Sequence, residues 1–140
     1  MTEFTSDIKT VPYSQEKVFA TLSDLNNLEK FRAQIPADKI SDFEFDSDYC
    51  SFTVNPVGKI GFRVVEREPS KTIKFAGEKL PVNLNMWIQL KEAAPNDTRM
   101  KLTVRAELNP FIKGMVSKPL QEGVNKIADV LAAIPYGEAL

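Results

Sequence analysis

The chain has 140 residues, of which 43% are hydrophobic and 26% are charged, and this composition predicts one globular domain spanning residues 1–140. Its 18 basic and 19 acidic residues are mixed along the sequence and leave a net charge of −1. That balance argues against a nucleic-acid partner and provides no polybasic surface for a membrane. The absence of histidine excludes histidine-dependent catalytic triads and histidine-containing metal sites.

The location of the protein is predicted from three sequence features. No apolar run approaches the roughly 18 residues that a membrane-spanning helix needs, so we expect no membrane insertion. The first ten residues lack the basic and apolar regions of a secretory signal. A single cysteine, Cys50, excludes an intrachain disulfide and suits a reducing compartment. We therefore expect a cytoplasmic protein.

The amino-terminal third predicts one strand followed by two short helices. Residues 3–12 alternate as a strand, with Phe4, Ser6, Ile8 and Thr10 on one face. Ser14 is a good helix N-cap, and apolar residues then recur at helical spacing. A second short helix is expected over residues 25–31.

The middle of the chain predicts six strands. Alternating segments separated by short turn sequences cover residues 40–45, 49–54, 59–68, 72–78, 83–90 and 99–108. Short connections between strands favour hairpins, and hairpins produce an antiparallel sheet with one solvated face.

The chain closes on a long predicted helix over residues 109–134. Asn109 followed by Pro110 is a helix-start signal, since asparagine caps free amides and proline suits the first helical position. One apolar stripe then follows at steps of three or four: Ile112, Val116, Leu120, Val124, Ile127, Leu131 and Ile134. Pro119 and Gly123 lie in this stripe, so either the helix faces open space there or it begins only near Pro119.

This order of elements resembles the START/Bet v 1-like superfamily (SRPBCC), which includes polyketide cyclase/dehydrase-like proteins. The resemblance rests on residues 13–24 and 28–31, with the pair Val18-Phe19 and the step Leu22-Ser23-Asp24. It implies an α+β helix-grip fold, with about seven antiparallel strands wrapped around the last helix and an apolar cavity between them. The glycine-rich loop of the plant allergens is missing, because residues 56–61 contain two glycines. The runner-up, a cone-shaped NTF2-type sheet, opens on helices and usually closes on a strand.

The candidate ligand-binding site is the apolar set that faces this cavity. From the strands it contains Phe52, Phe62, Phe75, Met86, Ile88, Leu102 and Val104, and from the last helix Met115, Val116 and Leu120. The alternative interpretation of the same residues is an ordinary packed core.

Candidate catalytic groups are few. Glu66 continues the inward face of its strand after Val64, so its carboxyl group could act at the cavity mouth or sit in water. Tyr49 could orient a ligand carbonyl, whereas Cys50 is expected to be a buried structural thiol. Asp42, Glu44, Asp46 and Asp48 form an acidic run that suits a solvated hairpin better than a calcium site. We predict no catalytic residue, no metal site and no cofactor.

Three functions remain open at this point. The first is a carrier or sensor that encloses a hydrophobic small molecule such as a lipid, isoprenoid or polyketide. The second is a cyclase/dehydrase-like enzyme that uses Glu66 and Tyr49. The third is an interaction domain with a filled core, which forms a homodimer through an outward-facing Trp87. The lack of an acid–base pair favours the first.

Overall fold

The computed structural model describes residues 2–27, 40–54, 58–78, 80, 82–134 and 136. The fold is α+β, with a run of six strands between its two helices. The bounds of the elements are β1 Thr2–Thr5, β2 Lys9–Val11, α1 Gln15–Leu22, β3 Ile40–Phe45, β4 Tyr49–Val54, β5 Gly58–Glu68, β6 Thr72–Glu78, β7 Leu84–Ala94, β8 Asp97–Ala106 and α2 Pro110–Ala132. No helix in the described residues is long and apolar enough to cross a membrane. The expected second short helix is present as one helical turn over residues 25–27. The rest of that helix, and residues 28–31 of the family resemblance, lie outside the described residues.

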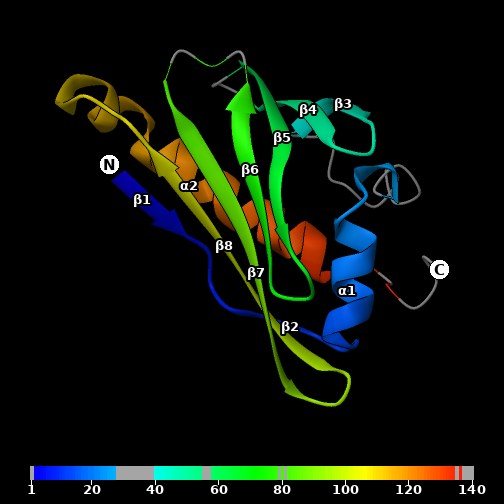
Figure 1. The fold of residues 1–140 in the computed structure, drawn as a ribbon. Coiled ribbons are helices and arrows are strands. Elements are labelled where there is room, and N and C mark those ends of the chain that lie inside the picture. Colours follow the sequence, from blue (N-terminus) through cyan, green and yellow to red (C-terminus); the bar gives the residue numbers. More distant parts are fainter. Residues whose placement is uncertain are drawn as a thin grey trace.

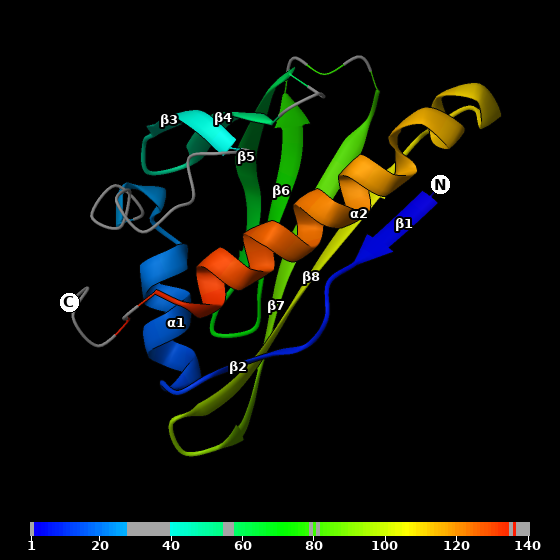
Figure 2. The same cartoon turned by 180° about the vertical axis from the view of Figure 1, so that it is seen from behind.

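The strands form one antiparallel sheet that α2 crosses diagonally on one face (Figures 1 and 2). The strand order is β1-β8-β7-β6-β5-β4-β3, and β2 also pairs with β8. Each strand from β3 to β7 pairs antiparallel with the next strand along the chain, as short hairpin connections require. The helix-grip arrangement predicted from the sequence is confirmed.

The two helices begin at the residues that the capping signals predicted. The Ser14 hydroxyl accepts a hydrogen bond from the Lys17 amide at 3.2 Å, and Asn109 Oδ1 accepts one from the Ile112 amide at 2.9 Å. Helix α2 runs without interruption through Pro119, so the alternative in which it begins near Pro119 is wrong. Open space beside the helix remains as the other explanation.

The first predicted strand is broken in two, and this changes which side chains are buried. Thr5 pairs with Thr103 in β1, whereas Lys9 pairs with Met100 in β2, so one extra residue lies in the first chain between these pairs. Ser6 still bonds to Leu102, whose amide donates to the Ser6 hydroxyl at 2.9 Å. Beyond that point the alternation is shifted by one residue, because an extra residue moves every later side chain to the other face. Ile8 is therefore 67% exposed, although it was predicted to share a face with Phe4, which is buried, and Val11 is buried.

Helix α1 and Tyr136 lie at one end of the sheet (Figure 1). The inner face of α1 buries Val18, Thr21 and Leu22. Gln15 donates through Nε2 to the carbonyl of Ser70 and, at 3.3 Å, to that of Leu90, which ties the helix start to the β5–β6 turn and to β7. Beyond α2, Tyr136 is fully buried, with its ring 5.8 Å from that of Tyr13 in an edge-on contact.

Candidate ligand-binding face

The sheet face under α2 is a continuous buried apolar surface. The seven strand residues of the predicted site all lie on it: Phe52, Phe62, Phe75, Met86, Ile88, Leu102 and Val104. Their inward orientation is confirmed, because simple alternation holds along the central parts of β4 to β8. Their contact with a ligand remains a prediction.

Four phenylalanine rings form an aromatic row at the β3 side of this face. The Phe43 ring lies 5.7 Å from both Phe45 and Phe52, and Phe52 lies 5.9 Å from Phe62. These centroid separations are typical of favourable ring pairs. Phe43 and Phe45 are only half-buried, so the row extends from the covered sheet face toward its open edge.

Helix α2 covers this face unevenly. Its principal contacts are with β8, β1 and β2, at one side of the sheet. Gln121 and Asp129 hold that flank, because Gln121 Nε2 donates to the Thr5 carbonyl at 2.9 Å and Asp129 forms an ion pair with Lys9. The amine of Lys9 has a raised pKa, mainly through its hydrogen bond to Asp129.

The opposite flank of α2 is apolar and only half-buried. At about 100° per residue, Val116, Leu120, Gly123 and Ile127 lie on the side of the helix away from Gln121 and Asp129. A methyl group placed at the α-carbon of Gly123 would meet no atom within 4 Å. Gly123 therefore has open space beside it, on the flank of α2 that faces away from Gln121 and Asp129.

Two of the three helix residues in the predicted site belong to this flank. Val116 and Leu120 are half-buried, as the apolar stripe suggested. Met115 is 65% exposed, so its predicted inward orientation is wrong. Successive residues of a helix point about 100° apart, so Met115 points to solvent although the next residue, Val116, lies on the half-buried flank.

A fully buried hydroxyl lies at the α1 end of this apolar interior. Thr21 faces inward between Val18 and Leu22, and its Oγ1 has no hydrogen-bond partner in the part of the chain that the structure describes. A buried hydroxyl without a partner is costly, so it is a point where a polar atom of a bound molecule would be stabilised.

The two predicted catalytic candidates point away from the apolar interior. A β-bulge between Val64 and Glu66 inserts one residue into β5, so that Glu66 pairs with Lys74 on the outer face. Tyr49 pairs with Arg63, also on the outer face, and its ring lies against Gly61 with the Arg63 guanidinium 5.0 Å from the ring centre. Of the two positions that the sequence left open for Glu66, the one in water agrees with its exposed place on the outer face, and the one at the cavity mouth is wrong. Neither named group of the enzyme alternative faces the apolar interior.

The same bulge places Arg67 on the inner side of the sheet, where its side chain is still 36% exposed, although strict alternation predicts it on the outer side. Arg67 pairs with the buried Ile73, and its guanidinium donates to the Ser23 carbonyl at 2.7 and 3.0 Å. It also forms an ion pair with Asp48 at 2.6 Å. Arg67 thus joins the carboxyl end of α1 to the β3–β4 turn. It supplies donors at the end of the helix, where carbonyl groups lack partners within the helix.

Cys50 and the acidic hairpin at residues 42–48 are the remaining candidates for chemistry, and both have surroundings that suit a structural role. Burial raises the pKa of the Cys50 thiol to about 12, with a smaller effect from the charge of Asp46, so the thiol stays protonated at neutral pH. Within the acidic hairpin, Asp46 accepts from the Asp48 amide at 2.9 Å and Asp42 accepts from the Thr53 hydroxyl at 3.4 Å.

Trp87 faces outward, as its position in the alternation predicted. It is half-buried on the outer face of the sheet between two cations on the neighbouring strands. Lys74 Nζ lies 5.4 Å and the Arg105 guanidinium 5.6 Å from the ring centre. Both separations suit cation–π attraction, so the ring already has partners within the chain.

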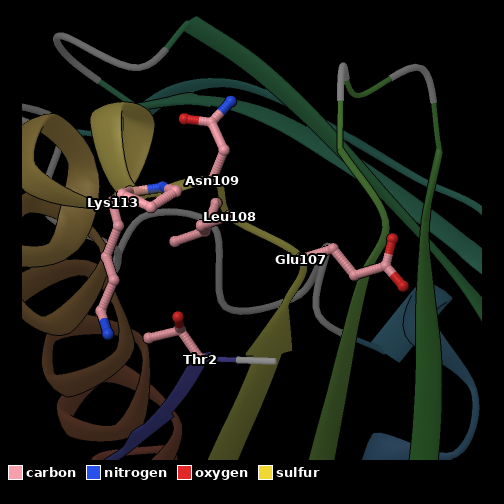
Figure 3. Close-up of a pocket in the computed structure, with 6 residues that line it drawn as sticks. Thr2, Glu107, Leu108, Asn109 and Lys113 are labelled. Carbon is pink, nitrogen blue, oxygen red and sulfur yellow. The ribbon is translucent and has the colours of Figure 1, made fainter.

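A surface pocket beside the amino end of α2, with a volume of about 780 Å³, was not predicted (Figure 3). It is lined by Thr2, Glu107, Leu108, Asn109, Pro110 and Lys113. In Figure 3 the Lys113 and Thr2 side chains lie on one side of it, while Glu107 points away. Glu107 accepts a hydrogen bond from Asn83 Nδ2 at 3.0 Å. The mixed polar lining distinguishes this pocket from the apolar sheet face. In the sequence, the helix-start signal at Asn109 was the one feature that pointed to this region.

Comparison with known protein-family models finds no match, and comparison with curated protein sequences finds none either. Solved structures do match. Norcoclaurine synthase from Thalictrum flavum, in complex with dopamine and hydroxybenzaldehyde, is similar with a TM-score of 0.71 and 13% identity, over 94% of this chain and 84% of that one. A protein of Thermus thermophilus has a TM-score of 0.67 and 17% identity, over 94% of both chains.

A START superfamily protein from Mycobacterium smegmatis has a TM-score of 0.61 and 12% identity, over 93% of this chain and 94% of that one. At these identities the likeness concerns the fold alone. The chain has the helix-grip fold of START and Bet v 1-like proteins.

Proposed function

We propose that this protein binds a hydrophobic small molecule between the buried sheet face and the half-buried flank of α2, without catalysing a reaction. The observation that carries the proposal is the open space beside Gly123, on an apolar flank of a helix that covers only one side of the sheet. Apolar pockets lined by aromatic and aliphatic side chains are the usual sites of such ligands.

Two further observations support an enclosed ligand. The aromatic row from Phe45 to Phe62 would provide flat contact surfaces for rings or unsaturated chains. The Thr21 hydroxyl could donate a hydrogen bond to a polar end group of the ligand or accept one from it. A neighbour with the same fold, norcoclaurine synthase, has been solved with two small aromatic molecules. We therefore expect a mainly apolar ligand that carries one polar group.

The first experiment is native mass spectrometry of protein purified gently from its own host. A bound apolar molecule that is lost on denaturation would identify the ligand class. A mass corresponding to the bare chain would favour a filled core that serves only as an interaction domain.

A pair of glycine substitutions in α2 tests the position of the site. We expect Gly123→Leu to weaken the binding of the apolar dye anilinonaphthalene sulfonate by about tenfold or more, because the new side chain would occupy the open space. Gly114→Leu is the matched control: Gly114 lies in the same helix, is exposed and also has no neighbour within 4 Å of an added methyl group.

Both substitutions replace a helical glycine, so each should stabilise the helix by up to about 1 kcal/mol. Equal dye binding by the two variants and the original chain would contradict the proposed site. Loss of dye binding in both variants would point instead to a general effect on the helix.

A further inference from the structure

A polar pocket of about 260 Å³ lies on the outer face of the sheet, on the side away from α2. Figure 1 shows this face, with β5, β6 and β7 side by side in front of the helix. Two cross-strand rows of three residues line the pocket, one with Glu66, Lys74 and Trp87 and one with Glu68, Thr72 and Gln89. The short Thr72 side chain lies in the middle of its row, between longer ones, and so accounts for the hollow.

The β-bulge at Val65 supplies the acidic wall of this pocket. Strict alternation along β5 would place Val65 and Arg67 in the two rows. The extra residue moves Glu66 and Glu68 into them instead. Bulges re-aim side chains in this way and are frequent beside binding sites. The irregularity in β5 therefore exchanges an apolar and a cationic side chain for two carboxylates at the pocket.

The polar groups of the pocket are largely free to bind a ligand. Gln89 Oε1 accepts a hydrogen bond from the Thr103 hydroxyl at 2.9 Å, which orients the amide. Its Nε2 hydrogens have no acceptor in the part of the chain that the structure describes. Glu66 forms no ion pair there, although Lys74 lies opposite it, because the Lys74 amine lies 5.4 Å from the Trp87 ring centre. The pocket thus combines hydrogen-bond donors and acceptors with part of an aromatic ring.

The charges at the pocket cancel. Glu66 and Glu68 carry two negative charges, and Lys74 carries a positive one. Lys71 supplies the second positive charge, with its amine 3.8 Å from the Glu68 carboxylate. A cationic ligand would meet Lys74, and an anionic ligand would meet two carboxylates, so neither is favoured.

The neighbouring strand changes this balance little. Arg105, whose guanidinium lies 5.6 Å from the Trp87 ring centre, is paired with Glu3 at 2.9 Å. Lys101 lies opposite Gln89, on the side of the pocket away from the carboxylates. The lining therefore suits an uncharged ligand that has several groups able both to donate and to accept hydrogen bonds.

We propose that this pocket binds a neutral monosaccharide. Sugar hydroxyl groups would donate to the two carboxylates and accept from Gln89 Nε2 and the Lys74 amine. The apolar C–H face of the ring would lie on the part of Trp87 that lines the pocket. A volume of about 260 Å³ is just below the range of about 300–1,000 Å³ that drug-sized ligands occupy, and it suits a single ring. The site lies on the opposite sheet face from the proposed apolar ligand and does not depend on that ligand.

Fluorescence tests the proposal without a label, because Trp87 is the one tryptophan of the chain. The full chain is titrated with D-glucose, D-galactose, D-mannose and N-acetyl-D-glucosamine. We expect at least one of them to change the Trp87 emission saturably at millimolar concentration. Glu66→Ala should raise the half-saturating concentration about tenfold and Gln89→Ala about fivefold, since each removes a hydrogen bond to the sugar. Glu122→Ala is the matched control, because Glu122 is an exposed carboxylate on α2, across the sheet, and its removal should leave the titration unchanged.

NMR gives a second readout that does not depend on fluorescence. The Gln89 side-chain amide and the Trp87 indole N–H should shift as the sugar is added, while the backbone amides of α2 stay in place. The proposal is overturned if none of the four sugars changes the emission or these resonances, or if Glu66→Ala binds as well as the original chain. It is also overturned if choline, acetate or glycine acts at lower concentration than the sugars, or if the sugar shifts only α2.

Discussion

The two halves of α2 have the same apolar spacing but different surroundings. In the carboxyl-terminal half, Val124, Ala128 and Leu131 are buried against the sheet. In the amino-terminal half, no residue of the helix is buried, and Phe111 and Met115 lie in solvent. The carboxyl-terminal half anchors the fold, whereas the amino-terminal half is exposed or only half-buried. Helical periodicity predicts that both are helix, but it does not predict which turns the sheet covers.

The largest expected difference is in stability. We expect Leu131→Ala to lower the free energy of unfolding by about 3 kcal/mol, because it removes a buried side chain and leaves a cavity. Met115→Ala, which truncates an exposed side chain in the other half, should change it by less than about 0.5 kcal/mol. Urea unfolding of both variants measures the difference. Similar losses in the two variants would show that the halves are equally packed.

Pro119 lies between the two halves and lacks the amide that would bond within the helix. We expect Pro119→Ala to stabilise the chain by about 1–2 kcal/mol, since it restores a helix hydrogen bond and removes a steric conflict. Hydrogen exchange of the amides at 111–118 should slow at the same time. Unchanged exchange there would mean that the proline does not weaken the amino-terminal half.

The contrast between the halves also shows what could be predicted from sequence. The hairpin strands and both helix starts followed from turn and capping residues, because these signals act within a few residues of chain. The bulge at Val65 and the break before Ile8 carried no such signal. Each shifts the alternation by one residue, and so Glu66, Arg67 and Ile8 lie on the faces opposite to those predicted.

The candidate site was predicted on its sheet side and only partly on its helix side. Regular alternation in β4 to β8 placed the seven strand residues on the buried face. The exposure of Met115 depends on how far α2 extends beyond the sheet, which is a tertiary property. Open space beside Pro119 and Gly123 was one of two interpretations of the sequence, and the structure supports it at Gly123.

A smaller effect is expected from the hydrogen bond that holds the covered flank of α2 to β1. Gln121→Ala removes the bond from Nε2 to the Thr5 carbonyl and should lower the free energy of unfolding by about 1 kcal/mol. Gln121→Glu keeps the size of the side chain but removes the donor, so it should be at least as destabilising. Urea unfolding compares the two variants, and a destabilised alanine variant beside a neutral glutamate variant would contradict the assigned bond.

The smallest expected effect concerns the ion pair between Lys9 and Asp129, which joins β2 to the carboxyl-terminal half of α2. The folded chain raises the pKa of the Lys9 amine above its ordinary value of 10.5. A raised pKa means that the folded state holds this proton more tightly than the unfolded state, so the stabilising contribution is complete below pH 10.5 and is lost as the pH rises through the raised pKa.

Titration of Lys9 by NMR should therefore give a midpoint above 10.5 in the original chain and a midpoint near 10.5 in Asp129→Asn. Glu122→Gln is a control, because Glu122 lies about 10 Å before Asp129 along the helix and forms no ion pair with Lys9 among the described residues, so its removal should leave the midpoint unchanged. An Asp129→Asn midpoint equal to that of the original chain would show that the ion pair between Lys9 and Asp129 does not link α2 to β2 in solution. The difference between the two halves would then rest on apolar burial alone.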